Sequence, residues 1–234
     1  MMMKETPKDL YESIWQEKLE TGQEQTPNRI KEAFKETDSG RRCLDIGCGD
    51  GSFSKLVMGH YRHVCGIDFS AVALKHAALQ GVSPVLADLD GQSLPFRHES
   101  FDLVSCLDVI EHVFDPEMLV QESYRVLKKG GVLILTTPNI RFIDHIRKLL
   151  MYGQFPKTSL DKGSYDGGHI HYFTFADIRH LLTTAGFRVL RQRGYDEKAY
   201  WTLKTLLFRL IMRWWEKDLR REFFCPGILF KVEK

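Results

Sequence analysis

Short apolar runs alternate with segments of helical spacing through the middle of the chain. The runs are rich in valine, leucine and isoleucine and have the length of buried strands. We expect strands at residues 43–46, 64–67, 84–87, 101–107 and 132–137. Helical spacing between them predicts helices at residues 52–58, 71–80 and 116–127, the last ending in the basic turn 128–131. Such alternation predicts a parallel sheet with helices on both faces.

The two ends of the chain follow other patterns. Residues 7–20 are spaced for a helix, and Thr26 and Pro27 mark a second helix as its N-cap and first residue. After the polar stretch 138–175, a helix is expected at 176–185 and a strand at 187–193. A last strand at 227–232 would complete one edge of the sheet after a long excursion. Irregular stretches this long are usually functional, so 138–175 and 194–226 are candidate lids.

These elements predict an α/β fold with a doubly wound, mostly parallel seven-stranded sheet and helical caps. The expected parts are an N-terminal helical cap at 1–40, an α/β core at 41–137 that binds a ligand, and a lid at 138–175 over an acceptor. Residues 176–234 would supply a C-terminal helix and edge strands, with an amphipathic insert at 194–226.

Composition narrows the function classes. Of the 234 residues, 43% are hydrophobic and 27% charged, so a full core can form and a disordered chain is excluded. A net charge of +2 speaks against DNA as a partner and disfavours RNA. The five cysteines form no C-x-x-C pair, which is typical of a reducing compartment. With no apolar leader or long apolar span in the sequence, we expect a cytoplasmic protein.

A glycine-rich segment, Leu-Asp-Ile-Gly-Cys-Gly-Asp-Gly at 44–51, joins the first core strand to its helix. Doubly wound sheets bind ligands at this place. A dinucleotide fingerprint would need glycine where Ser52 stands. The carboxylate of Asp45 would repel a pyrophosphate and attract an ammonium group. S-adenosylmethionine carries an ammonium and a sulfonium but no phosphate, so the pattern favours it over NAD.

This D-x-G-x-G-x-G pattern, followed by a second acidic strand end, resembles the class I S-adenosylmethionine-dependent methyltransferases, including methyltransferase domains of types 11, 12 and 23. The resemblance covers about residues 42–189 and implies their Rossmann-like fold. It implies that Asp68 binds the ribose hydroxyls, that Asp88 and Leu89 meet the adenine, and that Cys106 and Leu107 line the methionine part. The expected cofactor-binding residues are Asp45, Gly47, Cys48, Gly49, Gly51, Asp68, Phe69, Asp88, Leu89, Cys106 and Leu107.

Two histidines are the candidate catalytic residues. His112 follows the fourth core strand and His171 lies in the expected lid. Either could take a proton from an acceptor or position it, since the histidine pKa lies near neutrality. Two other interpretations stay open: Glu111 and His112 are structural and inert, or Asp108, Glu111, His112 and His171 bind a divalent metal. The metal set resembles the E-x-x-E-H motif of ubiquinone-pathway O-methyltransferases and, with its later histidine, of small-RNA 2′-O-methyltransferases. We include no metal among the expected cofactors.

An apolar segment at 199–215 is interrupted by Lys204, Arg209 and Arg213. It is too charged to span a bilayer and too apolar to lie bare in water. The interpretations that remain are packing in the core or over the acceptor pocket, a homodimer interface, and peripheral membrane contact.

We therefore expect a methyltransferase that uses S-adenosylmethionine and acts on a small or amphipathic acceptor, by in-line transfer to oxygen. The alternatives are a metal-dependent RNA 2′-O-methyltransferase and a non-catalytic sensor or partner protein that binds S-adenosylmethionine.

Overall fold

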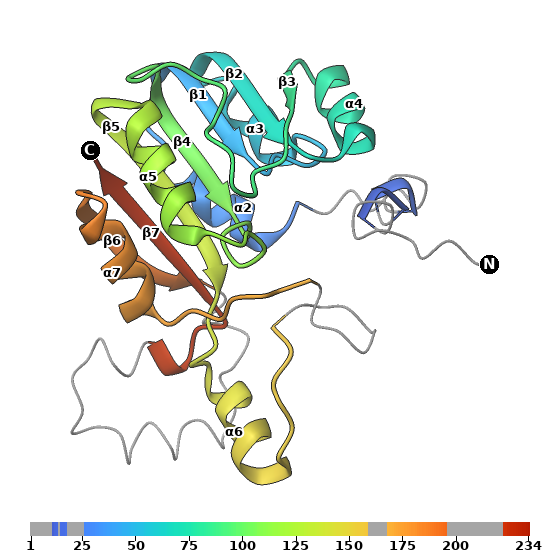
Figure 1. Cartoon of the computed structure of the whole chain (residues 1–234), viewed down its shortest axis with the longest axis vertical. Coiled ribbons are helices and arrows are strands. Elements are labelled where there is room, and N and C mark those ends of the chain that lie inside the picture. Colours follow the sequence, from blue (N-terminus) through green and yellow to red (C-terminus); the bar gives the residue numbers. More distant parts are fainter. Residues whose placement is uncertain (1–10, 14, 18–25, 159–167, 196–221) are drawn as a thin grey trace.

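The computed structural model describes residues 11–13, 15–17, 26–158, 168–195 and 222–234. Seven strands form one sheet in the order β3-β2-β1-β4-β5-β7-β6 (Figure 1). The first five strands pair in parallel, whereas β7 runs antiparallel to both β5 and β6. The strands are β1 (Gly40–Ile46), β2 (Tyr61–Asp68), β3 (Ser83–Leu86), β4 (Phe101–Leu107), β5 (Leu127–Pro138), β6 (Arg188–Tyr195) and β7 (Gly227–Glu233). The expected fold class is confirmed.

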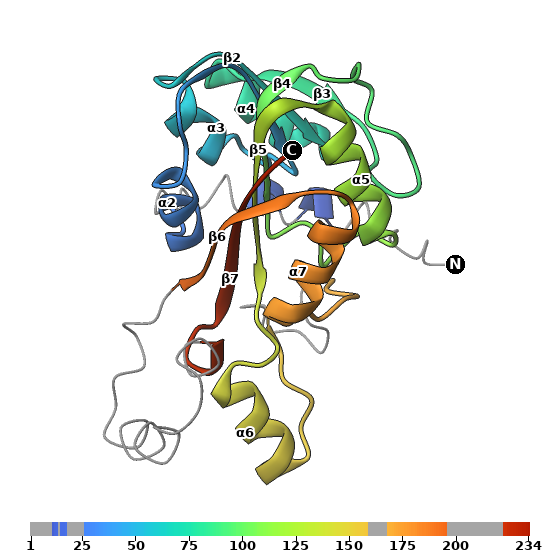
Figure 2. The same ribbon diagram turned by 90° about the vertical axis from the view of Figure 1, so that its left-hand side faces the viewer.

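Helices cover both faces of the sheet (Figure 2). The described helices with printed bounds are α2 (Asn28–Phe34), α3 (Ser52–Val57), α4 (Ala71–Leu79), α5 (Pro116–Val126), α6 (Ile143–Tyr152) and α7 (Phe175–Thr184). In this edge view α2 and α3 lie on one side of the sheet, and α5 and α7 lie on the other. The sheet therefore forms the middle of three layers.

The two core clusters follow the alternation of side chains along the strands. On β4, Leu103 packs with the α2 and α3 side while Val104 packs with the α5 and α7 side. On β5, Ile134 and its neighbour Leu135 divide in the same way. Because both faces of these strands are buried, their sequences read as continuous apolar runs, and this made them recognisable.

One predicted helix end is wrong. Residues 128–131 were expected to form the last turn after 116–127, but α5 ends at Val126 and β5 starts at Leu127. The backbone of Gly130 donates to the carbonyl of Lys234, and Lys234 donates to the carbonyl of Gly131. Pairing with β4 and with the end of β7 draws the basic segment into the sheet, and this long-range pairing is absent from the local pattern.

Two smaller expectations also fail. Pro27 is the N-cap of α2, in an extended conformation, and the first helical residue is Asn28, so Thr26 lies outside the helix. The stretch 138–175, expected to be irregular, contains α6, which ends at Tyr152 and has Gly153 as its C-cap in the left-handed conformation. The apolar segment at 199–215 lies outside the described residues.

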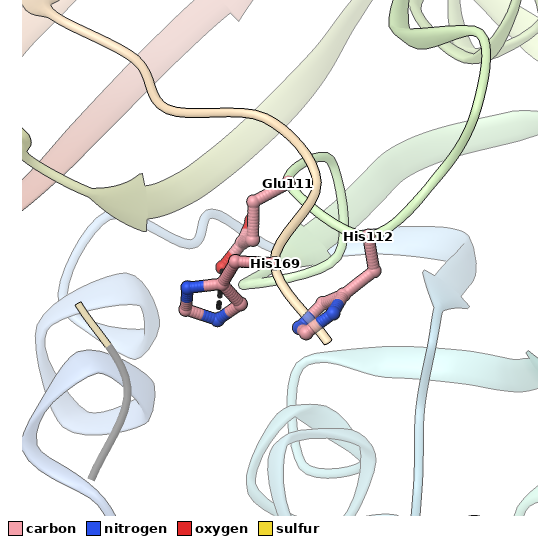
Figure 3. A group of neighbouring side chains, drawn as sticks. All are labelled: Glu111, His112 and His169. Atoms are coloured by element: carbon pink, nitrogen blue, oxygen red, sulfur yellow. Dashed lines mark ion pairs between the residues drawn. The ribbon is translucent and has the colours of Figure 1, made fainter. Parts of the chain in front are cut away.

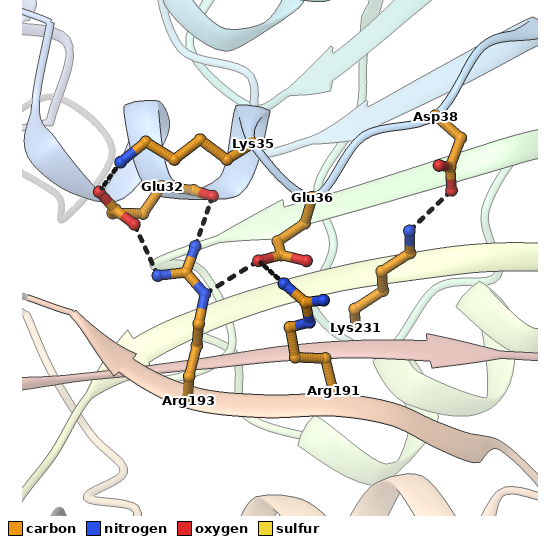
Figure 4. Close-up of polar contacts among 7 residues, drawn as sticks. All are labelled: Glu32, Lys35, Glu36, Asp38, Arg191, Arg193 and Lys231. Carbon is orange, nitrogen blue, oxygen red and sulfur yellow. Dashed lines mark hydrogen bonds and ion pairs between the residues drawn. The ribbon is translucent and has the colours of Figure 1, made fainter.

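Ion pairs join the edge strand β6 to α2 and to the residues that follow this helix (Figure 4). Arg193 contacts Glu32 at 2.6 Å and Glu36 at 2.9 Å, and Arg191 reaches Glu36 at 3.3 Å. Burial works to raise the pKa of Glu32, but hydrogen bonds from Lys35 and Arg193 outweigh it and lower that pKa. This network sets the position of α2 on its face of the sheet.

Candidate active site

The loop at 47–51 leaves β1 and turns into α3. The N–H groups of Gly47 and Cys48 donate to the carbonyl of Ile67 at 2.8 and 3.1 Å, which holds the loop against the end of β2. Gly47 has φ +65°, and a Cβ atom there would lie 2.3 Å from Val109 Cγ2. Only glycine meets both conditions. The loop thus presents bare backbone at the edge of the sheet.

Asp45 lies under this loop and is almost fully buried. Its carboxylate accepts hydrogen bonds from the hydroxyls of Ser54, at 2.7 Å, and Ser105, at 2.8 Å. Burial raises its pKa to about 6; the two serines work against this shift and the charge of Asp68 adds to it. In the described part of the chain no cation pairs with Asp45. A cationic ligand would therefore be stabilised here.

Asp68 ends β2 and is also buried. One carboxylate oxygen accepts from the N–H of Gly49 and the other from the N–H of Ser70, both at 2.9 Å. Burial raises the pKa of Asp68, against these backbone hydrogen bonds. Each carboxylate oxygen can accept a second hydrogen bond, so Asp68 keeps capacity for two hydroxyls.

Residues near the N-terminus lie against this part of the site. The ring of Tyr11 stacks on Phe69 with centroids 4.3 Å apart. Glu12 accepts hydrogen bonds from the Ser70 hydroxyl, at 2.7 Å, and from the N–H of Ala71, at 2.9 Å, where α4 begins. Trp15 covers the glycine loop, since a Cβ on Gly49 would meet its ring at 2.6 Å. The contacts of Tyr11, Glu12 and Trp15 with this site were not predicted from the sequence.

The other expected cofactor residues lie at the ends of neighbouring strands. Asp88 follows β3, is exposed, and accepts from the N–H of Asp90 at 3.0 Å. Leu89 packs against the core, Cys106 is buried at the end of β4, and Leu107 is half-buried beside it. Register places these strand ends side by side, because Ile46 pairs with both Ile67 and Cys106 and Asp68 pairs with Leu86. All the expected cofactor residues thus lie at or just after the carboxyl ends of β1, β2, β3 and β4, on the same side of the sheet.

Beyond β4, Asp108 adopts φ +55°, which is unusual for a residue with a side chain. Its carboxylate lies 2.9 Å from Arg29 Nε and accepts from the Thr136 hydroxyl at 2.7 Å. The Tyr195 hydroxyl lies 3.4 Å away as a further donor. These contacts fix Asp108 between α2, β5 and β6. The metal interpretation counted this residue as a ligand, and the structure places it in an ion pair instead.

Glu111 is the most deeply buried acid after β4, with 1% of its surface exposed. Its Oε2 accepts from the Thr137 hydroxyl at 3.0 Å, whereas Oε1 is buried and has no hydrogen-bond partner among the described residues. His169 Nε2 approaches this Oε1 to 4.0 Å. Burial, followed by the charge of Asp108, raises the pKa of Glu111 well above its usual range.

Glu111, His112 and His169 form a cluster (Figure 3). One ligand atom from each lies within 4.8 Å of the others, a spacing at which they could hold a metal ion. The two imidazole rings meet edge to face, with centroids 4.7 Å apart, and the Thr158 hydroxyl lies 2.6 Å from His169 Nδ1. The Gly168 carbonyl lies 3.2 Å from His112 Nδ1. The site therefore joins the segment after β4 to the segment before α7.

His171 lies apart from this cluster. Its ring stacks on Phe173 with centroids 5.9 Å apart, and its Nε2 is buried with no hydrogen-bond partner in the part of the chain that the structure describes. The N–H groups of Ile170 and His171 both donate to the carbonyl of Glu111. This pairing brings His169 rather than His171 to the glutamate side chain. The sequence contains both histidines, but nothing local distinguishes them.

The residues at the strand ends fit S-adenosylmethionine by their chemistry. The glycine loop presents backbone without side chains, and Asp45 is a buried carboxylate that pairs with no cation among the described residues. Asp68 has oxygen lone pairs left to accept from hydroxyl groups. When bound, this cofactor supplies a methyl group on a positively charged sulfur. The sheet order, the glycine loop and the acidic strand ends together define a class I S-adenosylmethionine-dependent methyltransferase.

The chain belongs to the methyltransferase domain family, whose model matches residues 17–192. It is 30% identical to a ubiquinone biosynthesis O-methyltransferase of Psychrobacter arcticus over 156 residues, which are 64% of this chain and 60% of the relative. A protein of the same name from Coxiella burnetii is 27% identical over 173 residues, 72% of this chain and 73% of that protein. The expectations of a methyltransferase and of S-adenosylmethionine as its donor are confirmed.

Solved structures support the fold at low sequence identity. A chain of the complex between the Haloferax volcanii Trm112 methyltransferase activator and a putative methyltransferase matches with a TM-score of 0.66, 16% identity, and coverage of 99% of both chains. A methyltransferase of Thermotoga maritima, titled a possible histamine N-methyltransferase, matches with a TM-score of 0.61 and 19% identity, over 88% of this chain and 87% of that one.

Proposed function

We propose that the chain methylates a hydroxyl oxygen of a small or amphipathic acceptor, and that His169, supported by Glu111, takes the hydroxyl proton. The observation that carries this proposal is the approach of His169 Nε2, to 4.0 Å, to a buried carboxylate oxygen for which the described residues supply no hydrogen-bond partner. The names of the two relatives, both O-methyltransferases of ubiquinone biosynthesis, support oxygen as the methylated atom.

The proposed chemistry needs little from the protein beyond alignment and a base. The sulfonium is a good leaving group, so the oxygen–methyl bond forms as the sulfur–methyl bond breaks. Because Nε2 of His169 faces Glu111, the acceptor oxygen loses its proton to Nδ1 of neutral His169, where the acceptor hydroxyl takes the place of the Thr158 hydroxyl. Burial raises the pKa of Glu111, so the positive charge that forms on His169 is what favours the ionised form of this carboxyl group, and the ionised form in turn stabilises the imidazolium. The adjacent ring of His112 positions the acceptor. In this proposal the glycine loop and Asp45 hold the donor. Asp68 binds the ribose of the donor, and Asp88 and Leu89 contact its adenine.

A divalent ion is the second candidate for the same place, because Glu111, His112 and His169 bring three ligand atoms together. Carboxylate and imidazole ligands suit a divalent ion such as Mn²⁺ or Fe²⁺. Such an ion would bind the acceptor hydroxyl and favour its loss of a proton. In that case His169 would act as a ligand and not as a base.

Incubation of the chain with isotope-labelled S-adenosylmethionine tests the proposal. The acceptors would be catechol, an alkyl-substituted catechol and a cell extract, with mass spectrometry of the labelled product. We expect an O-methylated small molecule. A labelled RNA or a labelled nitrogen would contradict the proposal, and cofactor binding by calorimetry without turnover of any of these would support the sensor alternative. Turnover that survives chelation favours His169 as the base, whereas turnover restored by Mn²⁺ or Mg²⁺ favours the metal.

A further inference from the structure

The end of α6 is an apolar surface that the described part of the chain leaves uncovered. Five of the ten large hydrophobic side chains that are exposed among the described residues fall between 149 and 155. Leu150 is 76% exposed, Met151 72% and Tyr152 63%, and Leu149 and Phe155 belong to the same group. We refer to these five residues as the α6 tip. Monomeric proteins rarely gather apolar side chains in this way unless they contact something.

The base of α6 is anchored, and only its far end is bare. Phe142 is buried, and Ile143 and Ile146 pack against Phe223 and Phe224. In both overall views the helix projects beyond the lower end of the sheet (Figure 1, Figure 2). The C-cap Gly153 donates to the carbonyl of Leu149 and adopts φ +61°, which turns the chain back and adds Phe155 to the tip. The helix is thus held firmly while its end points away from the body.

Positive charge accompanies the apolar residues. Arg147 and Lys148 precede the tip and are exposed, and Lys157 follows it. The sequence has no aspartate or glutamate from 145 to 158. Asp144 lies 3.3 Å from Arg147, in an exposed ion pair of the kind that contributes little. A protein partner for an apolar patch does not require this basic border, whereas an anionic lipid surface attracts it.

We propose that the α6 tip inserts into the interface of a membrane that carries anionic lipids. Leucine, methionine and phenylalanine side chains would enter the boundary between head groups and acyl chains, with Tyr152 at the level where tyrosine is favoured. Arg147 and Lys148 would contact lipid phosphates. This is peripheral docking, because no described helix is long and apolar enough to cross a membrane.

Docking at the tip would bring the candidate active site close to the lipid surface. The ring of Phe155 meets that of Tyr172 edge to face, with centroids 5.0 Å apart. The Tyr172 hydroxyl donates to the carbonyl of His169 at 3.4 Å. One contact chain thus joins the tip to the histidine cluster. The proposal itself does not depend on which acceptor is methylated.

Flotation of the whole chain with vesicles tests this proposal without any activity measurement. The vesicles would contain phosphatidylcholine alone or with phosphatidylglycerol. We expect the protein to bind the mixed vesicles at low salt and to bind phosphatidylcholine vesicles more weakly. Replacing Leu150 and Met151 by serine together should weaken binding to both by about tenfold, because apolar surface stays in water. Replacing Arg147 and Lys148 by glutamine should weaken binding by about fivefold per charge, and only on mixed vesicles.

Helix α4 offers matched controls, since Leu79 is 83% exposed and Lys75 is exposed on the same helix. Leu79→Ser and Lys75→Gln should leave binding unchanged. All variants change exposed side chains, so equal thermal unfolding is expected and shows that they are folded. The proposal is overturned if the wild-type chain floats with neither vesicle, or if the α6 variants bind as well as wild type. It is also overturned if the α6 variants only convert a dimer to a monomer, which would assign the tip to a second copy of the chain.

Discussion

The carboxylates at the ends of β1 and β2 are held differently from those that follow β4. Asp45 and Asp68 accept hydrogen bonds from neutral hydroxyl and N–H donors, with no cation against them among the described residues. After β4, Asp108 is paired with Arg29. The Oε1 atom of Glu111 faces His169 and has no hydrogen-bond partner among the described residues. The first region has the charge to receive a positive ligand, and in the proposed function the second region takes up the proton of the acceptor. The two regions can therefore be disabled separately.

Removal of His169 should have the largest effect. In His169→Ala, turnover should fall on the order of a hundredfold or more, because the acceptor proton loses its base. The dissociation constant for S-adenosylmethionine, measured by calorimetry, should stay within about twofold, since His169 belongs to the other region. The matched control is His171→Ala, which removes a ring from the same segment and should keep most of the activity. Equal losses in both variants would place the chemistry elsewhere.

Gly47→Ala should damage the cofactor region. The added Cβ would overlap Val109 at 2.3 Å in a backbone conformation with φ +65°. We expect a loss of about 2–4 kcal/mol in unfolding free energy, from overpacking and backbone strain together. Chemical denaturation would measure it. Gly59→Ala is the control, because a Cβ there meets nothing within 4 Å. Unchanged stability and cofactor binding in Gly47→Ala would contradict the close packing of the loop.

Asp45→Asn should weaken cofactor binding by about tenfold at neutral pH, since the ammonium group loses its carboxylate. The wild-type affinity should fall as the pH drops through about 6, where Asp45 of the free protein takes up a proton. The variant should bind with little change over that range. Calorimetry between pH 5 and 8 would measure both curves, and identical curves would show that Asp45 does not meet the cation.

The same substitution should stabilise the free protein. The folded pKa of Asp45, about 6, lies above its ordinary value of 3.8, so the folded state holds the proton more tightly. The resulting stabilisation is present below pH 3.8 and is lost as the pH rises through about 6. Above that range Asp45→Asn avoids the cost of a buried charge, about 2–3 kcal/mol. Thermal unfolding without cofactor would measure this gain, and a loss of stability at pH 8 would argue against it.

Arg29→Gln should have the smallest effect. The ion pair with Asp108 is only partly buried, so the loss in unfolding free energy should stay below about 1 kcal/mol. Burial and Asp108 already raise the pKa of Glu111, and Arg29 partly offsets them. Without Arg29 that pKa rises further, and the acid limb of the activity profile should move to higher pH. The control Lys31→Gln removes an exposed charge from the same helix and should leave the profile in place.

The parallel part of the fold could be predicted from the sequence because its strands are buried on both faces. The predicted strand at 101–107 coincides with β4, and those at 43–46 and 64–67 lie within β1 and β2. The errors in the predicted elements lie where residues distant in sequence determine the local structure. Residues 128–131 join the sheet because Gly130 and Gly131 pair with Lys234, a partner more than 100 residues away.

The candidate site divides in the same way. The cofactor region follows from one local motif, since a loop between a strand and a helix already places its glycines and Asp45 at the sheet edge. The acceptor region depends on a second segment that reaches Glu111 from beyond α6. Which histidine faces Glu111 is decided by two backbone hydrogen bonds to its carbonyl, so the choice between His169 and His171 needed the structure.

The position of β7 also has a consequence for biosynthesis. Among the described strands β6 pairs with β7 alone, and β7 is synthesised after residues 196–226. Strands β1 to β4 have all their sheet neighbours among β1 to β5, so the donor-binding ends of these strands can assemble before β7 is made. Strand β6 can join the sheet only after β7 has left the exit tunnel, and the ion pairs of Arg193 with Glu32 and Glu36 form at that later stage.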